Sequence, residues 1–360
     1  MEDYSYINEN FSSYIPPMRE HVISGIVYSL ISVLGMIGNG CVILAVIYVR
    51  TLQTTTNVFI VNLAVADFLA SSLLPFYTVS FWTDNFFPSL DILCALTTGL
   101  LRACLAASSF NLASIGINRL LIVIQAKSIY KVLFSPKSMT IWIICLWVCA
   151  LSLSYVPHFM GIGRIGYTIR PHQCGIIPAN PGTKTAHTIL TLGMYPVPFC
   201  IIVVCYSWIY CYVYRHNARM MKYEIEKPNA TSSTISSADP ASSSTNLAPK
   251  KVKRISSVQI QITKNLFYIL CAFVICLSPQ MICSFVGCVN LFTKTFVTVN
   301  SMVNPFIYGA NHPHFRRVFM DFLNRLRGKL SNGLDSENAD DSSTNNQRFS
   351  TNLSSNNTNM

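Results

Sequence analysis

The stretch "VISGIVYSLISVLGMIGNGCVILAVIYV", residues 22–49, carries no charged side chain from end to end. A helix needs about 20 apolar residues to cross the hydrocarbon core of a bilayer, so this run is long enough to span a membrane. Six further apolar runs follow at 57–82, 93–124, 138–160, 187–214, 261–285 and 291–309. The sequence therefore predicts an all-α membrane protein, a bundle of seven transmembrane helices.

Composition and charge agree with this prediction. Hydrophobic residues make up 51% of the chain and charged residues 11%, whereas soluble domains are about one quarter charged. Twenty Lys and Arg residues follow the odd-numbered spans and five lie on the opposite side, which places the N-terminus outside and the C-terminus in the cytosol. The net charge of +11 is thus an orientation signal. We expect contact with membrane lipids and no nucleic-acid partner.

The expected organisation is one membrane domain at 22–323, preceded by an extracellular N-terminus at 1–21 and followed by a disordered cytosolic tail at 324–360. The N-terminus lacks the apolar core and cleavage site of a signal peptide, so the first span is expected to insert uncleaved. A long inner loop at about 215–260 is predicted to be disordered at 228–249, where Ser and Thr dominate. These Ser/Thr-rich segments are either kinase substrates or plain solvated tethers.

Most of the thirteen cysteines lie inside spans, where Cys is usually a small apolar packing residue. Cys94 starts the third span at its outer end, and Cys174 lies in an outer loop. Both face an oxidising compartment, where a disulfide would pin the loop over the bundle. Cys283 and Cys288 form either a second outer disulfide or a pair of packed thiols.

Polar residues inside the spans are candidate functional residues, because each is costly in lipid unless it faces the interior. Asp67 is the one acidic residue in any predicted span. Ser108, Asn300 and Asn304 could surround it, and the last two share a helix face because they lie one turn apart. Such a group suits either a small hard cation such as sodium or a water-filled polar cluster, and the two are compatible.

On the third span, Ser108, Leu112, Ile115 and Arg119 recur at spacings of four, three and four. This spacing defines one helix face. Arg119 is therefore expected to point inward at the cytosolic end of the bundle, toward other helices and away from lipid.

These features, in this order, resemble the rhodopsin-like (class A) G-protein-coupled receptors over roughly residues 22–323. The matching residues are Asn39, Asp67, the Cys94 and Cys174 pair, Asn118 with Arg119, Trp147, Pro198, Tyr206, Phe273, Pro279 and "NPFIY" at 304–308. The spacing from "NPFIY" to Phe315 resembles that of receptors with a short amphipathic helix after the seventh span. The loop "GIGRIGYTIRPHQCGI" and the inner "SIYKVLFSPKS" resemble most the melatonin receptors and the invertebrate receptor called trapped in endoderm.

The resemblance implies roles for the matched residues. Arg119 would be the switch that meets a heterotrimeric G protein when the sixth helix moves outward, and Tyr206 and Tyr308 would stabilise that open state. The other residues of the switch motifs are Asn118, Phe273, Pro279, Asn304 and Pro305. Asp67, Ser108, Asn300 and Asn304 would form a sodium site that favours the resting state. Kinases and arrestin would act at the Ser/Thr-rich tail.

Three positions depart from the family pattern. Asn118 replaces the usual Asp before the arginine, Leu277 replaces the usual Trp of the sixth helix, and Gln259 stands where an acidic partner for the arginine is often found. Each change weakens a contact that holds the resting state. We therefore predict ligand-free signalling, with weak coupling to G proteins as the alternative.

The candidate ligand-pocket residues are Leu101, Arg102, His158, Met194 and Thr298. Leu101 stands where amine receptors place an Asp, and Thr298 where opsins carry the retinal-binding Lys, so neither an amine nor a retinal cofactor is expected. Arg102 lies about 12 Å below Cys94 by helical rise and could bind a carboxylate or phosphate, or it could snorkel outward. The expected ligand is an acidic lipid-like or small organic molecule, with a peptide as the rival.

Met194 and His158 also argue against melatonin itself, since melatonin receptors have His and Asn at these positions. Arg164, Arg170 and His187 add positive or titratable character near the entrance. Asn10, in "NFS", is an expected glycosylation site on the outer side.

Other function classes find little support. The chain has no His-Glu-x-x-His metal motif and no Gly-x-Ser-x-Gly nucleophile elbow, so neither an enzyme nor a metal site is expected. A proton-coupled transporter would need a relay of ionisable groups through the membrane, and Asp67 is the single acid there.

Overall fold

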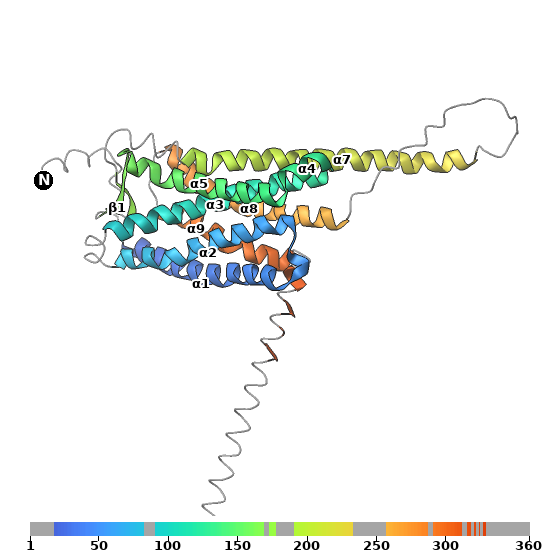
Figure 1. The fold of residues 1–360 in the computed structure, drawn as a ribbon. Coiled ribbons are helices and arrows are strands. Elements are labelled where there is room, and N and C mark those ends of the chain that lie inside the picture. Colours follow the sequence, from blue (N-terminus) through green and yellow to red (C-terminus); the bar gives the residue numbers. More distant parts are fainter. Residues whose placement is uncertain are drawn as a thin grey trace, which may run out of the picture. The chain divides into compact units, whose positions relative to one another are not determined.

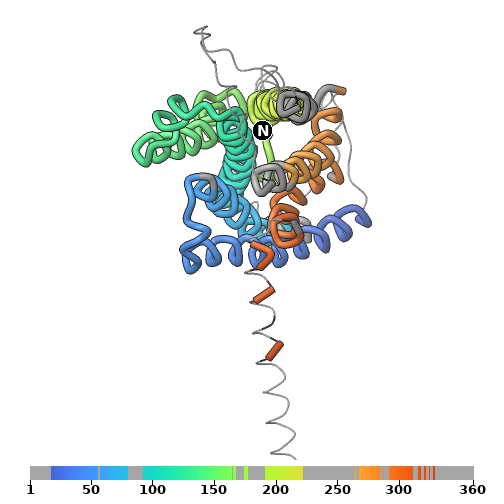
Figure 2. Tube along the Cα trace, turned by 90° about the vertical axis from the view of Figure 1, so that its right-hand side faces the viewer, coloured from blue at the N-terminus to red at the C-terminus, as the bar shows by residue number. Residues whose placement is uncertain are grey.

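The computed structural model describes residues 18–82, 91–168, 173–177, 191–232, 257–286 and 291–311, and short helical stretches at 315–317, 320–321, 324 and 327–328. Its long helices are α1 Met18–Tyr48, α2 Thr55–Trp82, α3 Asp91–Val123, α5 Pro136–Phe159, α7 Pro196–Ser232, α8 Ser257–Val286 and α9 Leu291–Asn311 (Figures 1 and 2). Each overlaps one predicted span, which confirms the seven-helix bundle. Two short helices, η1 Arg50–Leu52 and α4 Lys127–Leu133, lie in connections between the long ones. Met1–Tyr308 forms one compact unit and Gly309–Met360 another.

Apolar side chains cover much of the outside of the bundle while polar ones are buried. Five helices, α1, α2, α3, α5 and α7, have an apolar stretch long enough to cross a membrane, and α8 has a shorter one at Phe267–Cys283. On α1, the exposed residues include Ile26, Leu30, Val33 and Ile37, whereas Ser24, Ser32 and Asn39 are buried. This distribution suits lipid outside and polar contacts inside.

α3 is the central helix and packs against α2, α5, α7 and both strands (Figure 2). Its middle carries Ala103, Ala106 and Ala107, which are fully buried. Small side chains allow neighbouring helices to approach closely. α3 therefore holds its polar residues at fixed positions against several helices at once.

Two glycines lie where helices approach most closely. A Cβ atom at Gly35 of α1 would overlap the Ser71 side chain on α2, and one at Gly99 of α3 would overlap the Tyr155 ring on α5. The Tyr155 hydroxyl donates to the Leu96 carbonyl at 2.9 Å. Glycine is therefore needed at these two helix–helix contacts.

A two-stranded antiparallel sheet, which the all-α prediction did not include, follows α5. β1 Arg164–Thr168 pairs with β2 Gln173–Ile177, and Tyr167 lies opposite Cys174. Isoleucine, tyrosine and threonine favour strands, and the sequence analysis treated this segment as a loop. The sheet gives Cys174 a defined position beside α3.

α7 is longer than predicted. It continues to Ser232, whereas the predicted span ends at 214 and predicted disorder begins at 228. Residues 228–232 are thus helical, and the rest of that segment lies outside the described residues. The segment "HNARMMKYEIEK" that follows the span is rich in strong helix formers, so the helix extends beyond the apolar stretch.

Candidate functional site

The inner end of α3 carries a buried arginine. Arg119 is 4% exposed, and its guanidinium is close enough to the Tyr206 and Tyr308 side chains for electrostatic coupling. These tyrosines come from α7 and α9. Arg119 makes no hydrogen bond or ion pair with any residue that the structure describes, and its Nε atom is buried. Three helices thus meet at a cation surrounded by neutral groups.

No carboxylate is among the groups that face Arg119 in the described part of the chain. Its neighbour Asn118 is fully buried, and so is Leu277 at 3% exposure on α8. The side chain of Gln259 lies outside the described residues. The residue next to Arg119 is therefore a neutral amide, Asn118, where the resemblance leads one to expect a carboxylate.

Prolines interrupt the helices that carry the other switch residues. Pro279 lies inside α8 and Pro305 inside α9. A proline removes one backbone hydrogen bond and favours a bend at that point. Phe273 of α8 is 1% exposed, and the rings of Tyr206 and Phe267 lie 6.2 Å apart between α7 and α8. α8 and α9 therefore each have a bend point, and aromatic rings join α7 to α8.

A buried carboxylate occupies the middle of the bundle. Asp67 of α2 is 0% exposed, and its Oδ2 atom accepts a hydrogen bond of 2.7 Å from Asn304 Nδ2 on α9. The hydroxyls of Ser108 and Ser301 lie beside the carboxylate without hydrogen-bond geometry. The Oδ1 atom of Asp67 has no partner among the described residues. Oxygen ligands of this kind fit a small cation or water.

The structure changes the membership of this cluster. Ser301, which the sequence analysis did not select, reaches Asp67, and its spacing of three residues from Asn304 was the signal that could have found it. Asn300 is buried with an unpaired Oδ1, and no described interaction joins it to Asp67. The described cluster is therefore Asp67, Ser108, Ser301 and Asn304.

Amide side chains tie the helices around this cluster. Asn39 Nδ2 donates to the Gly35 carbonyl at 2.9 Å and to the Ser301 carbonyl on α9 at 2.8 Å. A second group of linked hydrogen bonds starts at α5. Trp147 Nε1 of α5 donates to Asn62 Oδ1 at 3.0 Å, and Asn62 Nδ2 donates to Asn111 Oδ1 at 2.8 Å. These buried bonds fix α9 against α1 and link α5, α2 and α3.

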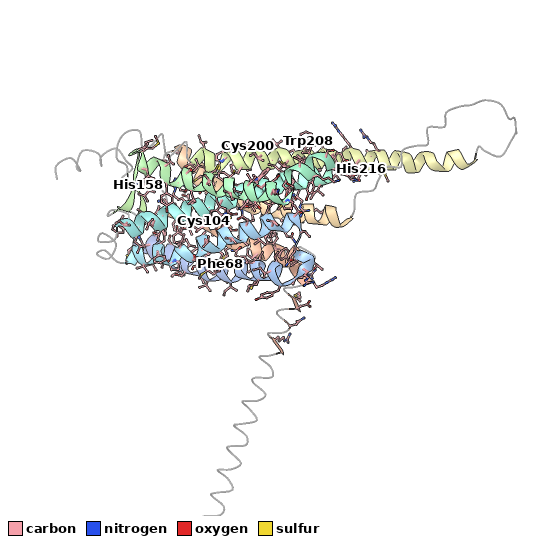
Figure 3. All side chains as sticks on the ribbon, viewed as in Figure 1. Phe68, Cys104, His158, Cys200, Trp208 and His216 are labelled. Carbon is pink, nitrogen blue, oxygen red and sulfur yellow. A yellow bond between two sulfur atoms is a disulfide. The ribbon has the colours of Figure 1, made fainter. Side chains whose placement is uncertain are left out.

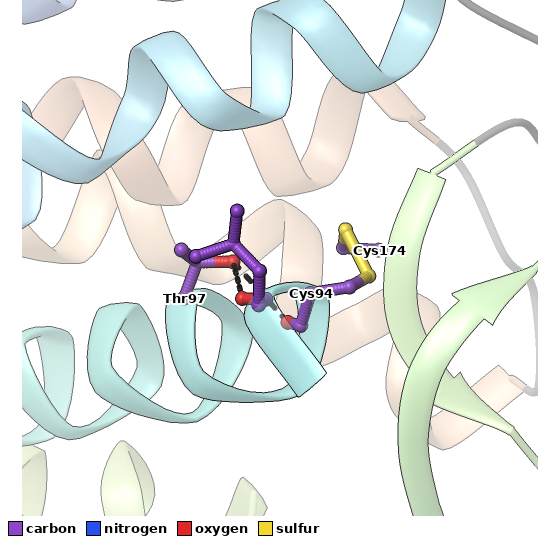
Figure 4. The surroundings of a disulfide bond; sticks show 4 residues. Cys94, Thr97 and Cys174 are labelled. Carbon is purple, nitrogen blue, oxygen red and sulfur yellow. Dashed lines mark hydrogen bonds between the residues drawn. A yellow bond between two sulfur atoms is a disulfide. The ribbon is translucent and has the colours of Figure 1, made fainter. Parts of the chain in front are cut away.

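A disulfide closes the outer end. Cys94 of α3 and Cys174 of β2 are bonded, with Cα atoms 5.5 Å apart (Figure 4). Both are buried together with Tyr167, and Tyr77 packs against them. The predicted pair is thus bonded in the structure, and the hairpin is held against α3. Cys283 is also disulfide-bonded, while Cys288 lies outside the described residues.

The five candidate ligand-pocket residues have different surroundings in the structure. Leu101 and Met194 are buried apolar residues, and Met194 packs with Ala106, Ala107 and other residues of the core. The Thr298 hydroxyl donates to the Thr295 carbonyl of its own helix at 2.8 Å. His158 lies at the end of α5 (Figure 3), where its Nδ1 accepts a bond of 3.2 Å from the Ile165 backbone N–H. His158 therefore anchors the hairpin.

Arg102 has a basic neighbour that the sequence analysis did not associate with it. Lys294 of α9 lies within electrostatic range of Arg102. Tyr77 of α2 and Tyr195, just before α7, also lie within electrostatic range of Arg102. Helical rotation on α3 alone gives no information on α9, so sequence spacing could not reveal this pair. Asn10, Arg170, His187 and the Arg164 side chain lie outside the described residues.

Comparisons with known proteins agree with this geometry. The family described as "7 transmembrane receptor (rhodopsin family)" matches residues 38–308. A protein named "Rhodopsin, GQ-coupled" from Mizuhopecten yessoensis is 27% identical over 320 residues, covering 84% of this chain and 60% of that protein. An "Alpha-1A adrenergic receptor" from Oryzias latipes is 27% identical over 323 residues, covering 84% of this chain and 67% of that receptor. The chain spans 60% of the length of the first relative.

Squid rhodopsin has a similar fold, with a TM-score of 0.65 at 21% identity over 87% of this chain and 88% of that one. The finer resemblance to melatonin receptors and trapped in endoderm stays a prediction. The family consists of receptors, which agrees with the expectation that the chain is not an enzyme. With the family match over residues 38–308 and the helix arrangement that accompanies it, the chain belongs to the rhodopsin family of seven-transmembrane receptors.

Proposed function

We propose that this protein is a plasma-membrane receptor that passes an extracellular ligand signal to a heterotrimeric G protein in the cytosol. The observation that carries the proposal is Arg119, a buried cation at the inner end of α3 that faces Tyr206 and Tyr308 and no described carboxylate. Burying a charge without a counter-ion costs free energy. This cost falls if the surrounding helices separate and a partner or water reaches the charge. Helix movement and partner binding are then coupled.

The resting state is proposed to be weakly held. Asn118 cannot form an ion pair with the adjacent guanidinium, and Leu277 has a smaller side chain than the usual Trp of α8. A ligand needs less differential binding energy to shift an equilibrium that already lies near balance. The receptor should therefore catalyse nucleotide exchange on its G protein without ligand.

Sodium is the proposed opposing ligand. Asp67 Oδ1 and the Ser108 and Ser301 hydroxyls lack hydrogen bonds in the described part of the molecule, and hard cations prefer such oxygens. A sodium ion held among α2, α3 and α9 would favour the packed arrangement. The side chains present fit the ion, and exchange should be slower in sodium than in a bulky organic cation.

The ligand is proposed to be acidic. Arg102 lies in the outer half of α3 beside Tyr77 and Tyr195, while the amine-type acid is replaced by the buried Leu101. Guanidinium groups bind carboxylates and phosphates through two parallel hydrogen bonds. A peptide with an acidic side chain remains the rival. Thr298, in place of the opsin lysine, argues against retinal.

The tail and inner loop would be phosphorylated by kinases and then bound by arrestin. Their Ser/Thr-rich sequences support this part of the proposal, since phosphorylation there adds a dense negative charge. Both segments lie largely outside the described residues.

Ligand-free nucleotide exchange on a panel of purified G proteins tests the proposal. Wild type is compared with Arg119→Ala, and Arg19→Ala is the control because Arg19 is an exposed arginine at the start of α1. We expect exchange to fall by about tenfold or more in Arg119→Ala and to stay unchanged in Arg19→Ala. Thermal unfolding curves check that wild type and Arg119→Ala are both folded. If both are folded and exchange is equally fast in both, Arg119 is not the switch.

A further inference from the structure

A pocket of about 420 Å³ opens on α7, near the inner end of its apolar stretch Thr191–Met221. Binding pockets for small molecules typically measure about 300 to 1,000 Å³. The described residues that line this one come from α7 and include Trp208, Cys211, Tyr212, Arg215, His216 and Arg219. They alternate at spacings of three and one, which places them on one face of the helix. Trp208 and His216 lie along this part of α7 in Figure 3.

The pocket face is distinct from the face of α7 that packs against α3. A Cβ atom at Gly116 of α3 would touch Ile202, Cys205 and Tyr206, which defines the packing face. The lining residues lie roughly 100° around the helix from that face, at 100° per residue. Trp208 is 57% exposed. The pocket therefore opens toward the surroundings of the bundle, and lipid can reach it.

The two ends of the pocket differ in chemistry. Trp208 lies toward the middle of the membrane span, and Arg219 follows it by eleven residues, or about 16 Å of helical rise. Between them, the rings of Tyr212 and His216 stack with centroids 6.2 Å apart. Helical side chains lean toward the N-terminus of their helix, so the Arg215 and Arg219 side chains lean toward the aromatic end.

Charge and shape together indicate an amphiphilic ligand. Arg215 and Arg219 are exposed, and no acidic residue is among the described residues that line the pocket. A pocket with an aromatic end inside the membrane and a cationic end at its edge suits an acyl chain joined to an anionic headgroup. A water-soluble protein does not reach the depth of Trp208. The pocket therefore favours a lipid over a protein partner.

We propose that this pocket binds an anionic phospholipid, with its phosphate on Arg215 and Arg219 and its acyl chain along Cys211 and Trp208. Guanidinium groups bind phosphate oxygens in pairs, and the Tyr212 hydroxyl can donate to another oxygen. In the orientation expected from the charge distribution, the lipid comes from the cytosolic leaflet, which is rich in anionic lipids. This site goes beyond the proposed receptor function.

Native mass spectrometry of the purified full-length receptor in detergent counts the bound lipids directly. The probes are phosphatidylglycerol, phosphatidylcholine with the same acyl chains, and glycerol phosphate. Each arginine beside an anionic headgroup contributes about fivefold in affinity. Phosphatidylglycerol should therefore bind roughly 25-fold more tightly than phosphatidylcholine. Glycerol phosphate should not displace it, because the acyl chain supplies part of the binding.

Matched charge-removing variants locate the site. Arg215→Gln and Arg219→Gln should each weaken phosphatidylglycerol binding by about fivefold and leave phosphatidylcholine binding unchanged. Arg50→Gln is the control, since Arg50 is an exposed arginine at the inner end that does not line the pocket. It should bind phosphatidylglycerol like wild type. All three residues are exposed, so thermal unfolding should show the same Tm for every variant.

Fluorescence quenching places the acyl chain. In reconstituted phosphatidylcholine vesicles, a small fraction of phosphatidylglycerol brominated on its acyl chain should quench wild-type tryptophan fluorescence more than the same fraction of brominated phosphatidylcholine. Trp208→Phe should lose this difference, because Trp208 lines the pocket.

Four results would overturn the proposal. They are equal affinity of wild type for the two phospholipids, displacement of phosphatidylglycerol by glycerol phosphate, equal weakening in Arg50→Gln, and quenching by brominated phosphatidylglycerol that is unchanged in Trp208→Phe. If Arg215→Gln and Arg219→Gln bind the lipid like wild type but lose nucleotide exchange, the arginines contact the G protein instead. Lipid binding is measured without a G protein, so failure of this site is distinguishable from failure of the receptor function.

Discussion

The outer half and the inner end of α3 each hold an arginine without a described acidic partner, but the surroundings of the two arginines differ. At the inner end, Arg119 is 4% exposed and faces the neutral side chains of Tyr206 and Tyr308. In the outer half, Arg102 is half-buried and lies within electrostatic range of Tyr77, Tyr195 and Lys294. A fully buried cation among neutral groups is suited to switch between partners, whereas a half-buried cation in the outer half is suited to bind a negative ligand. The same residue type thus supports different functions according to its neighbours.

The largest expected effect is a loss of stability when the disulfide at the outer end of α3 is removed. Cys174→Ser removes the bond that holds β2 to α3, and loss of a native disulfide typically costs about 2 to 5 kcal/mol. We expect a clearly lower Tm. Cys200→Ser, at a free exposed cysteine of α7, should leave the Tm unchanged. A Cys174→Ser receptor as stable as the Cys200→Ser control would contradict this role.

The next effect alters the inner end. Asn118→Asp places a carboxylate beside Arg119, and hydrogen bonds to charged groups contribute about 1.5 to 3 kcal/mol. Stabilising the resting state in this way should lower ligand-free nucleotide exchange by about tenfold or more. Gln125→Glu adds the same charge at an exposed position and serves as the control. If exchange is as fast in Asn118→Asp as in that control, the missing carboxylate does not determine basal activity.

A smaller effect concerns the polar cluster between the two ends. Asp67→Asn removes the carboxylate that faces Ser108, Ser301 and Asn304. Wild-type exchange should be several-fold slower in sodium chloride than in N-methylglucamine chloride, and the variant should lose this difference because its charge is gone. Potassium chloride controls for ionic strength. A sodium effect that survives in Asp67→Asn would place the ion elsewhere.

The smallest effect compares one hydroxyl at each end. Tyr195→Phe removes a hydroxyl near Arg102, and Tyr206→Phe removes one near Arg119. A single hydrogen bond contributes about 1 kcal/mol, or roughly fivefold. Tyr195→Phe should weaken binding of an acidic ligand at Arg102 and spare ligand-free exchange, whereas Tyr206→Phe should lower ligand-free exchange and spare ligand binding. If each variant changes both ligand binding and ligand-free exchange, the two arginines do not act independently.

Sequence reasoning worked where a signal is local. The run at 22–49 and its six successors predict spans because length and apolarity alone decide whether a helix can cross a membrane. The predicted position of Cys94 and Cys174 on the oxidising side was enough to suggest their pairing. Spacing on one helix correctly placed Arg119 and Ser108 within the bundle, since both are buried.

It failed where two distant segments had to meet. The β1–β2 hairpin depends on pairing across a turn and on the Cys174 bond, and no single residue in it demands a sheet. α7 continues past its apolar stretch because helix formers follow it, and apolarity does not detect them. Ser301 joined the Asp67 cluster from α9 without being selected, although its spacing from Asn304 was available.

The sequence by itself determined that this chain crosses a membrane as a bundle of helices and which face of α3 turns inward, because burial of apolar surface and helical periodicity are properties of each segment. The tertiary structure alone decided which further groups lie together: Ser301 beside Asp67, and Lys294 within electrostatic range of Arg102. Electrostatic interactions fall off with distance between atoms and are indifferent to distance along the chain. The packing of α2, α3, α7 and α9 therefore sets the chemistry of each site.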